Sequence, residues 1–342
     1  MLRKLIRSAV IGLACAVFIL VALPKLNHLN FFQSEPMSFK DAVRIASPAV
    51  VNVYNRAFSA NSGDQLEVGN LGSGVIMSKD GYILTNKHVI QNADQIVVAL
   101  QNGQLFDASL IGSDSLTDLA VLKIRADNLS TIPQNPKRQI HVGDIALAIG
   151  NPYNLGQSVS QGIISAVGRN AVGDSVGRQN FIQTDASVNR GNSGGALINS
   201  LGELIGINTL SIGKTSNEIA EGLNFAIPID LANDIMKKII RDGRVIRGYF
   251  GVQSDIFFSN GQGVNIEKGI LITNVSPESP AGKAGVKAGD IILKVGDIEA
   301  ISPAQMMQVI SNTRPNTKLN VVILRLGKQI ELPVVIEEYP IN

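Results

Sequence analysis

The sequence predicts a mainly β protein, and composition and spacing both support this fold class. Thirty-three of the 342 residues are glycines, and short runs of valine and isoleucine alternate with turn-forming residues along most of the chain. Such spacing is typical of β-barrels rather than of helical bundles. The length predicts about two domains, and a hydrophobic content of 45% is enough for packed cores.

The chain begins with a candidate membrane anchor. Three basic residues within the first seven positions precede an uncharged run from Ser8 to Pro24, which is about the minimum length for a spanning helix. A secretory signal peptide usually has a shorter apolar core and a small-residue cleavage site after it, and no such site follows this run. We therefore predict an uncleaved anchor over residues 1–26, with its basic flank inside, and a short tether over residues 27–37.

Charge and cysteine content exclude other classes of protein. The net charge of +2, with 17% charged residues, leaves no basic tract beyond the first few positions, so we expect no nucleic-acid partner. The single cysteine, Cys15, rules out an intramolecular disulfide. We expect no cofactor and no metal.

The region after the tether predicts one short helix and many strands. Ser38 is placed to cap the helix, with Asp41 at its third position. Ten strand patterns follow, at residues 50–54, 74–77, 81–84, 95–100, 120–124, 145–149, 162–167, 181–184, 196–198 and 204–209. Ten short strands suit a double barrel whose cleft holds the functional site.

A change of pattern near residue 245 predicts a second domain. Leu231, Ile235 and Ile239 recur at helical spacing, and Gly243 supplies a stop. This helix would join a domain over residues 38–243 to one over residues 247–342. In the second domain, a helix should begin after Ser302 as N-cap, with Pro303 in its first position.

A serine between glycines, in Gly191-Asn192-Ser193-Gly194-Gly195, is the strongest candidate for a nucleophile. Glycine allows the backbone dihedrals that turn adjacent N–H groups toward one point. The serine hydroxyl needs a general base and a group that orients the base. We assign these roles to His88, at the end of an apolar strand pattern, and to Asp118, immediately before another.

The order His88, Asp118, Ser193 matches that of chymotrypsin rather than of subtilisin or the α/β-hydrolases. Two other residues could be considered in place of these. Asp114 lies among turn formers, where we expect a solvated loop carboxylate, and His141 precedes a strand without a nucleophile to pair with. We expect neither of them to take part in catalysis.

Three motifs resemble those of the HtrA serine proteases, and the similarity extends over nearly the whole chain. They are Thr85–Val89, Asp118–Lys123 and Gly191–Leu197. A further run, Ser279–Ile292, is similar to a PDZ domain of the HtrA type, and we find no second copy. The resemblance implies a chymotrypsin-like double β-barrel protease domain followed by one PDZ domain, behind an N-terminal transmembrane helix. This arrangement is similar to the membrane-anchored branch of the family.

The proposed chemistry follows from the three residues. Ser193 attacks a peptide carbonyl, His88 takes its proton and later protonates the leaving amine, and Asp118 orients the imidazole. The N–H groups of Gly191 and Ser193 hold the oxyanion. In trypsin-like folds the floor of the primary pocket lies six residues before the nucleophile, here at Ser187, with a wall formed by Asn208, Thr209 and Leu210. No carboxylate occupies these positions, so we expect a small aliphatic residue at the cleaved bond.

A PDZ domain binds a free peptide C-terminus by strand addition, and loop N–H groups receive the carboxylate. By resemblance, that loop consists of Tyr249, Phe250, Gly251 and Val252. Met306 and Ile310 of the following helix are predicted to face the peptide groove.

Regulation and partners follow from the resemblance alone. Tyr153 and Arg169 lie in segments that read as long loops near the cleft, and Arg169 is the candidate relay to the PDZ domain. The resemblance implies a homotrimer in the bacterial inner membrane, single-pass, with its catalytic and PDZ domains in the periplasm. It implies activation by C-terminal peptides of misfolded outer-membrane proteins, and an anti-sigma factor as substrate. A broad quality-control protease and a non-enzymatic PDZ adaptor are the alternatives.

Overall fold

The computed structural model describes the greater part of the chain. The described residues are 2–22, 38–58, 66–152, 155–169, 181–211, 223–254 and 269–340, and only the backbone is described at positions 22, 169, 210 and 211. Two compact units, Met1–Asp41 and Ala42–Asn342, divide it. The fold class predicted above is confirmed, since the second unit is mainly β and the first carries an apolar helix.

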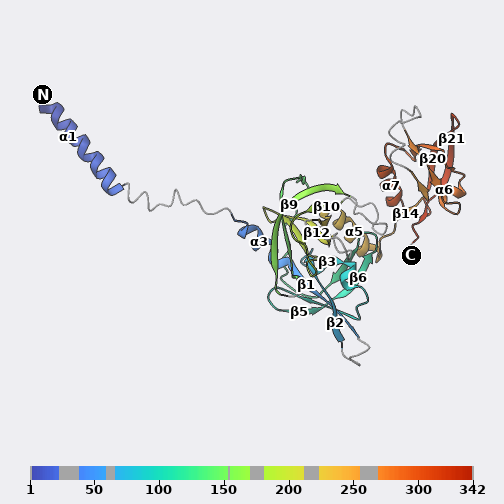
Figure 1. Ribbon diagram of the computed structural model, residues 1–342, viewed down its shortest axis with the longest axis horizontal. Helices are drawn as coiled ribbons and strands as arrows, with labels where there is room; N and C mark the ends of the chain where they lie inside the picture. Colours follow the sequence, from blue (N-terminus) through green and yellow to red (C-terminus); the bar gives the residue numbers. More distant parts are fainter. Residues whose placement is uncertain are drawn as a thin grey trace, which may run out of the picture. The chain divides into compact units, whose positions relative to one another are not determined.

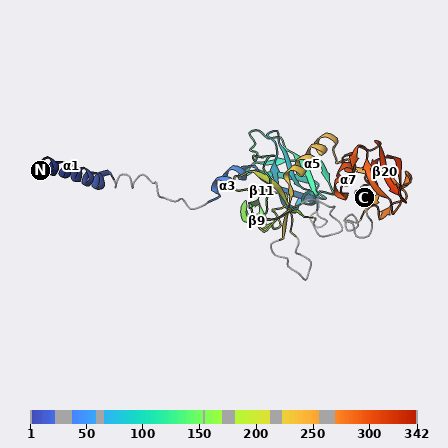
Figure 2. The same cartoon turned by 90° about the horizontal axis from the view of Figure 1, so that it is seen from above.

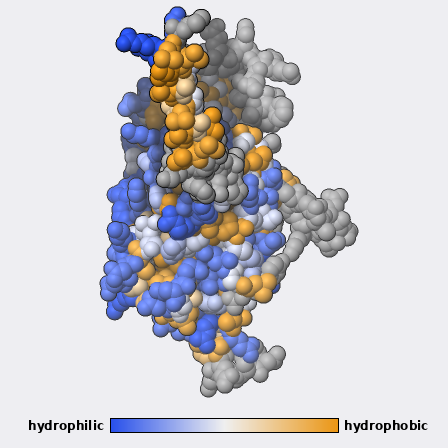
Figure 3. All heavy atoms as spheres, turned by 90° about the vertical axis from the view of Figure 1, so that its left-hand side faces the viewer, coloured by the Kyte–Doolittle hydropathy of each residue, from blue (hydrophilic) through white to orange (hydrophobic). Residues whose placement is uncertain are grey.

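The first unit contains the apolar N-terminal helix. Helix α1 (Leu2–Val17) continues into the π-helical turn η1 (Phe18–Ala22). Residues Leu2–Val21 are long and apolar enough to cross a membrane by length and composition. Figure 3 shows the apolar side chains gathered along α1, with hydrophilic ones at its N-terminal end. The predicted tether lies entirely outside the described residues.

Helix α3 (Lys40–Ala46) begins close to the predicted cap. The Lys40 N–H donates to the Ser38 hydroxyl at 3.2 Å, so Ser38 lies one residue further from the helix than an N-cap would. The 3₁₀ turn η2 (Ser47–Ala49) leads from this helix into the first strand.

The first half of the predicted protease domain is a seven-stranded antiparallel sheet in the order β5-β4-β1-β2-β3-β7-β6. Its strands are β1 (Val50–Phe58), β2 (Leu66–Ile76), β3 (Tyr82–Asn86), β4 (Gln95–Ala99), β5 (Leu105–Asp107), β6 (Ser109–Asp114) and β7 (Leu119–Lys123). The short helix α4 (Lys87–Ile90) follows β3.

The second half is a closed barrel in the order β10-β13-β12-β11-β8-β9. Its strands are β8 (Ile145–Gly150), β9 (Ser158–Arg169), β10 (Phe181–Thr184), β11 (Ala196–Asn199), β12 (Leu204–Ser211) and β13 (Asn224–Pro228). The two halves lie side by side in Figure 1, the first in blue to teal and the second in green to yellow, with β3 packed near β12.

All ten predicted strands are present, but three strands were not predicted. They are β5, β6 and β13. β5 has only three residues, and β13 ends in a proline, which cannot donate to a sheet ladder. β6 contains Gly112, where a Cβ atom would lie 2.0 Å from the Gly243 carbonyl oxygen. The close approach of Gly243 therefore requires a glycine at position 112. This glycine interrupts the apolar pattern, so the strand was not recognised in the sequence.

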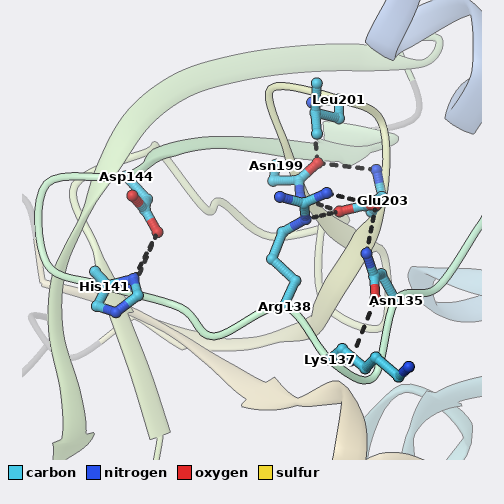
Figure 4. A network of polar contacts seen from close by, with 8 residues as sticks. All are labelled: Asn135, Lys137, Arg138, His141, Asp144, Asn199, Leu201 and Glu203. Carbon is cyan, nitrogen blue, oxygen red and sulfur yellow. Dashed lines mark hydrogen bonds and ion pairs between the residues drawn. The ribbon is translucent and has the colours of Figure 1, made fainter.

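The segment between β7 and β8, which joins the two halves, is bound to the β11–β12 turn by hydrogen bonds. Figure 4 shows Arg138 and Asn135 from this segment around Glu203 of the turn. Arg138 Nε donates to Glu203 Oε2 at 2.5 Å, and the Leu204 N–H donates to the Pro133 carbonyl at 2.8 Å. The side-chain hydrogen bond from Arg138 lowers the pKa of Glu203. The crossing segment is thus fixed on the second barrel.

Helix α5 (Ile229–Asp242) is present, and it ends at the glycine predicted as its stop. Gly243 adopts a left-handed φ of 73°, and its N–H donates to the Ile239 carbonyl at 2.8 Å. Glycine accepts this conformation without steric cost, which explains the stop.

The C-terminal region contains small antiparallel sheets and two helices. β14 (Gly248–Tyr249) pairs with β22 (Glu337–Glu338), and β15 (Val252–Gln253) pairs with β17 (Asn274–Val275). A five-stranded sheet contains β16 (Ile270–Leu271), β18 (Ile291–Val295), β19 (Ile298–Glu299), β20 (Lys318–Arg325) and β21 (Lys328–Val335). The described helices of this region are α6 (Pro280–Lys283) and α7 (Pro303–Asn312), and α7 contacts β14. Figure 2 shows α7 and β20 within this region. Ser302 caps α7 as predicted, accepting from the Gln305 N–H at 3.2 Å.

Candidate active site

The first sheet brings His88 and Asp118 together. Since β3 pairs with β7, Asn86 lies opposite Leu119, and the residues that follow one strand meet those that precede the other. His88 Nδ1 lies 2.5 Å from Asp118 Oδ2, and the His88 N–H donates to Oδ1 at 3.0 Å. The carboxylate therefore fixes both the ring and the backbone of the histidine, which selects the tautomer with a proton on Nδ1.

Asp118 is held in an unusual backbone conformation. Its φ is 54°, in the left-handed region where aspartate is tolerated better than most residues. Two neighbours compensate, because the Lys87 N–H and the Asn86 side-chain amide both donate to the Asp118 carbonyl, at 2.8 and 3.0 Å. Such a conformation persists only where surrounding contacts fix it.

Asp114 is buried, and the expectation of a solvated loop carboxylate is wrong. Only 6% of it is exposed, and both of its oxygens accept from the Arg247 guanidinium, at 2.6 and 2.8 Å. Burial alone would raise the pKa of Asp114, but the bonds and charge of Arg247 and the bonds from Thr117 lower it overall. The sequence could not reveal the partner, because 133 residues separate the two. Asp114 nevertheless takes no direct part in the His88 pair.

The turn before β11 presents the candidate nucleophile. Gly191 and Gly194 have φ values of 104° and 82°, which few other residues adopt. The Gly194 N–H donates to the Asn208 carbonyl at 2.8 Å, which ties the turn to β12. A Cβ atom on Gly194 would lie 2.2 Å from the Ser73 carbonyl oxygen, so a side chain is excluded there.

The Ser193 hydroxyl points to a carbonyl and not to the histidine. Its Oγ donates to the Thr209 carbonyl at 3.0 Å, and among the described residues no hydrogen bond joins it to His88. The Thr209 hydroxyl in turn donates to Asp118 Oδ2 at 3.4 Å. Thr209, predicted as a pocket wall, therefore contacts both halves of the candidate triad, a role that its sequence context did not indicate.

The two candidate oxyanion donors are free within the described structure. Neither the Gly191 nor the Ser193 N–H donates to another described residue. A cleft of about 240 Å³ opens beside Gly191, lined by residues 68–71 of β2 together with Arg190 and Gly191. This cleft therefore adjoins the Gly191 end of the nucleophile turn.

The predicted pocket residues differ in their surroundings. Ser187 is exposed, and its carbonyl accepts from Ser160 Oγ at 2.7 Å. Asn208 is fully buried, and its side-chain amide donates to the Ala196 carbonyl at 2.9 Å, so it faces the barrel interior. The side chain of Leu210 lies outside the described residues. Ser187 alone of this set is both exposed and described.

The predicted PDZ loop lies at the start of the C-terminal region. Gly251 has a φ of 82°, and a Cβ atom there would lie 2.1 Å from the side chain of Ser279. β15 begins at Val252 and pairs with β17, and no other described strand pairs with it. Phe250, Met306 and Ile310 all belong to the buried core of this region, with 4%, 5% and 8% exposed.

The side chains of the two predicted regulatory residues lie outside what the structure describes. Tyr153 is not among the described residues, and of Arg169 only the backbone, at the end of β9, is described. His141 is exposed, and its N–H donates to Asp144 Oδ2 at 2.8 Å, away from the site.

Comparisons with known proteins identify the family. The trypsin-like peptidase domain family matches residues 72–207, and the PDZ domain family matches residues 260–336. The serine endoprotease DegS of Haemophilus influenzae is 74% identical over the full length of both chains. The chain belongs to the DegS family of serine endoproteases. DegS of Escherichia coli is 54% identical over 99% of each chain.

A solved structure agrees with this membership. The crystal structure of the serine endoprotease from Yersinia pestis is 52% identical, with a TM-score of 0.73. It covers 90% of this chain and 100% of the solved one. The protein is thus a serine endopeptidase with one PDZ domain, which removes the non-enzymatic adaptor from consideration.

Proposed function

We propose that His88, Asp118 and Ser193 form the catalytic triad of this endopeptidase. The observation that supports this best is the 2.5 Å contact between His88 Nδ1 and Asp118 Oδ2, within reach of the turn that carries Ser193. His88 Nε2 takes the Ser193 proton as the oxygen attacks the peptide carbonyl, and returns it to the leaving amine. Asp118 stabilises the imidazolium that forms between these steps.

The free N–H groups of Gly191 and Ser193 are proposed as the oxyanion hole. Each would donate to the negatively charged oxygen of the tetrahedral intermediate, a contribution typically worth about 3 kcal/mol for one donor. Ser193→Ala in the purified full chain should abolish peptide cleavage. Retained cleavage would show that another group is the nucleophile.

The resting Ser193 hydroxyl supports a regulated enzyme. Because it donates to Thr209 rather than to His88, the nucleophile must turn before it can transfer its proton. We propose that a C-terminal peptide of a misfolded outer-membrane protein binds at residues 249–252 and favours this change. The carboxylate would bind the loop N–H groups and the peptide would add a strand beside β15. Tyr153 and Arg169 are proposed to relay the signal.

The proposed substrate is a membrane anti-sigma factor, and the proposed assembly is a homotrimer. The apolar helix over residues 2–21 would anchor the chain in the inner membrane, with the basic end in the cytoplasm and both domains in the periplasm. Exposed Ser187 at the pocket floor brings no negative charge, which supports cleavage after a small aliphatic residue. Preferential cleavage after lysine or arginine would contradict that specificity.

The decisive experiment measures cleavage of an anti-sigma factor by the full chain in detergent micelles, with and without C-terminal peptides. Cleavage that is slow alone and rises with peptide supports the proposal. Casein digestion without peptide would instead support the broad quality-control protease. An Arg169→Ala variant that responds normally would remove Arg169 from the relay.

A further inference from the structure

Ser73 is a buried serine of the first sheet whose hydroxyl and backbone N–H both form hydrogen bonds with segments of the second barrel. It stands between Gly72 and Gly74 on β2 and is 0% exposed. Its Oγ donates to the Gly191 carbonyl at 2.7 Å and accepts from the Asn151 N–H at 3.0 Å. Its own N–H donates to the Ser193 carbonyl at 2.9 Å. One residue thus holds the carbonyls on both sides of Asn192.

This geometry constrains the candidate oxyanion donors. A peptide unit is planar, so fixing the Gly191 carbonyl fixes the unit that joins Gly191 to Asn192. The direction of the Gly191 N–H then depends on rotation within Gly191 itself, whose φ of 104° is accessible to glycine. The Ser193 N–H lies in the next unit, which is bounded by the two held carbonyls. Both donors are therefore set relative to β2.

The second hydrogen bond reaches a different loop. Asn151 follows β8, and its Oδ1 accepts from the Gly156 N–H at 2.9 Å. Because the same hydroxyl accepts from the Asn151 N–H and donates to the Gly191 carbonyl, it connects this loop directly to the nucleophile turn. A displacement of Asn151 therefore changes the hydrogen bonding of the Ser73 hydroxyl, and with it the contact to the Gly191 carbonyl.

We propose that the Ser73 hydroxyl is a positioning group for catalysis, which ties Asn151, immediately after β8, to the turn that carries the oxyanion donors of Gly191 and Ser193. This inference rests on the oxyanion hole proposed above. Alanine at this position would remove the hydrogen bonds that the Gly191 carbonyl and the Asn151 N–H form with the Ser73 hydroxyl, so the nucleophile turn would lose a buried contact that holds it. Ser73→Ala should therefore lower the rate of the chemical step and leave the affinity for substrate nearly unchanged.

The test uses a fluorophosphonate probe on the full chain in detergent micelles, with a saturating C-terminal peptide. The Ser193 oxygen displaces fluoride at phosphorus, its proton passes to His88, and the oxyanion donors bind the phosphoryl oxygen. For Ser73→Ala we expect the maximal labelling rate to fall about tenfold to a hundredfold, less than or equal to the loss of one donor. The probe concentration for half-maximal rate should change less than twofold.

Two further variants separate positioning from general damage. Ser73→Thr keeps the hydroxyl and should recover most of the labelling rate. Thr85→Val removes a buried hydroxyl that donates to the Ser73 carbonyl at the same 2.7 Å, but leaves the Ser73 hydroxyl in place. It should lower the melting temperature while keeping the rate within about threefold.

Wild-type labelling by Ser73→Ala, or equal rate losses in Ser73→Ala and Thr85→Val, would overturn the inference. Labelling of a Ser193→Ala chain would instead overturn the proposed nucleophile, so the two failures are distinguishable. Melting temperatures of all variants show whether each is folded at the assay temperature.

Discussion

The two halves of the candidate site differ in how completely they are assembled. On the first sheet, His88 and Asp118 are joined through the ring and through the backbone, at 2.5 and 3.0 Å. On the second barrel, the Ser193 hydroxyl donates to the Thr209 carbonyl, and two N–H groups of the turn have no described acceptor. In the proposed triad, the histidine and aspartate are already paired, whereas the serine hydroxyl still has to turn toward the histidine. The proposed regulation would therefore act on the serine turn without disturbing the histidine.

The largest expected effect comes from removing the charge of Asp118. We expect Asp118→Asn to lower kcat about 10⁴-fold, because an amide cannot hold the histidine in the tautomer that accepts a proton at Nε2. The measurement is kcat with saturating peptide. The fold should remain intact, since the hydrogen bonds to the Asp118 carbonyl do not involve its side chain.

Asp144→Asn is the matched control for this prediction. Asp144 also lies beside a histidine, with its Oδ2 3.9 Å from His141 Nδ1, but on the surface of the second barrel. We expect kcat within about twofold of wild type, since the pair is exposed and distant from the turn. A similar loss of kcat in Asp118→Asn and Asp144→Asn would contradict the assignment of His88 as the general base.

The sequence predicted the candidate triad residues better than the residues that hold the serine turn. His88, Asp118 and Ser193 stand in recognisable motifs, and their chain order restricts the choice. The contacts of Ser73 and Thr209 were not predicted because each joins residues that are separated in the sequence. The Ser73 hydroxyl donates to the Gly191 carbonyl, 118 residues away, and the Thr209 carbonyl accepts from the Ser193 hydroxyl, 16 residues away. A serine between two glycines in an otherwise apolar strand pattern was the available signal for Ser73.

The burial of Asp114 was missed for a related reason. Turn residues around it indicated solvent, whereas the Arg247 guanidinium that covers it comes from beyond helix α5. Packing between distant segments decides burial, and neither periodicity nor turn chemistry encodes it. Similarly, β6 escaped prediction because its glycine is explained only by the approach of Gly243.

A smaller effect should follow from disturbing the nucleophile turn. In Gly194→Ala the new Cβ would meet the Ser73 carbonyl oxygen at 2.2 Å and the Thr85 hydroxyl at 2.5 Å. We expect kcat to fall about 100-fold, because displacements of about 1 Å near the reacting atoms have costs of that size. The measurement is kcat, together with the urea concentration at half unfolding.

Gly103→Ala separates backbone strain from this collision. Gly103 has a φ of 85°, close to the 82° of Gly194, but a Cβ there meets nothing within 4 Å. Both variants should lose about 1 kcal/mol of unfolding free energy through the left-handed backbone, and only Gly194→Ala should lose activity. Full activity in Gly194→Ala would show that the nucleophile half tolerates movement, contrary to its proposed role.

The smallest effect tests how the acid–base half is supported. Asp114 accepts from the Thr117 N–H at 3.0 Å, so it fixes the turn that carries Asp118. Asp114→Asn should lower the unfolding free energy at pH 7 by about 2 kcal/mol, because it leaves the Arg247 charge without its partner. Asp80→Asn, in an exposed pair 3.7 Å from Lys123, is the control and should cost less than about 0.5 kcal/mol.

The same pair predicts a dependence of stability on pH. Since the pKa of Asp114 is lower in the folded chain than its usual 3.8, the folded state binds fewer protons than the unfolded state near that pH. The contribution of Asp114 is therefore complete above pH 3.8 and disappears as the pH falls through the folded-state pKa. Urea unfolding at a series of pH values should show the wild type and Asp114→Asn converging in acid. A constant difference at all pH values would mean that Asp114 supports the turn through hydrogen bonds that survive its protonation.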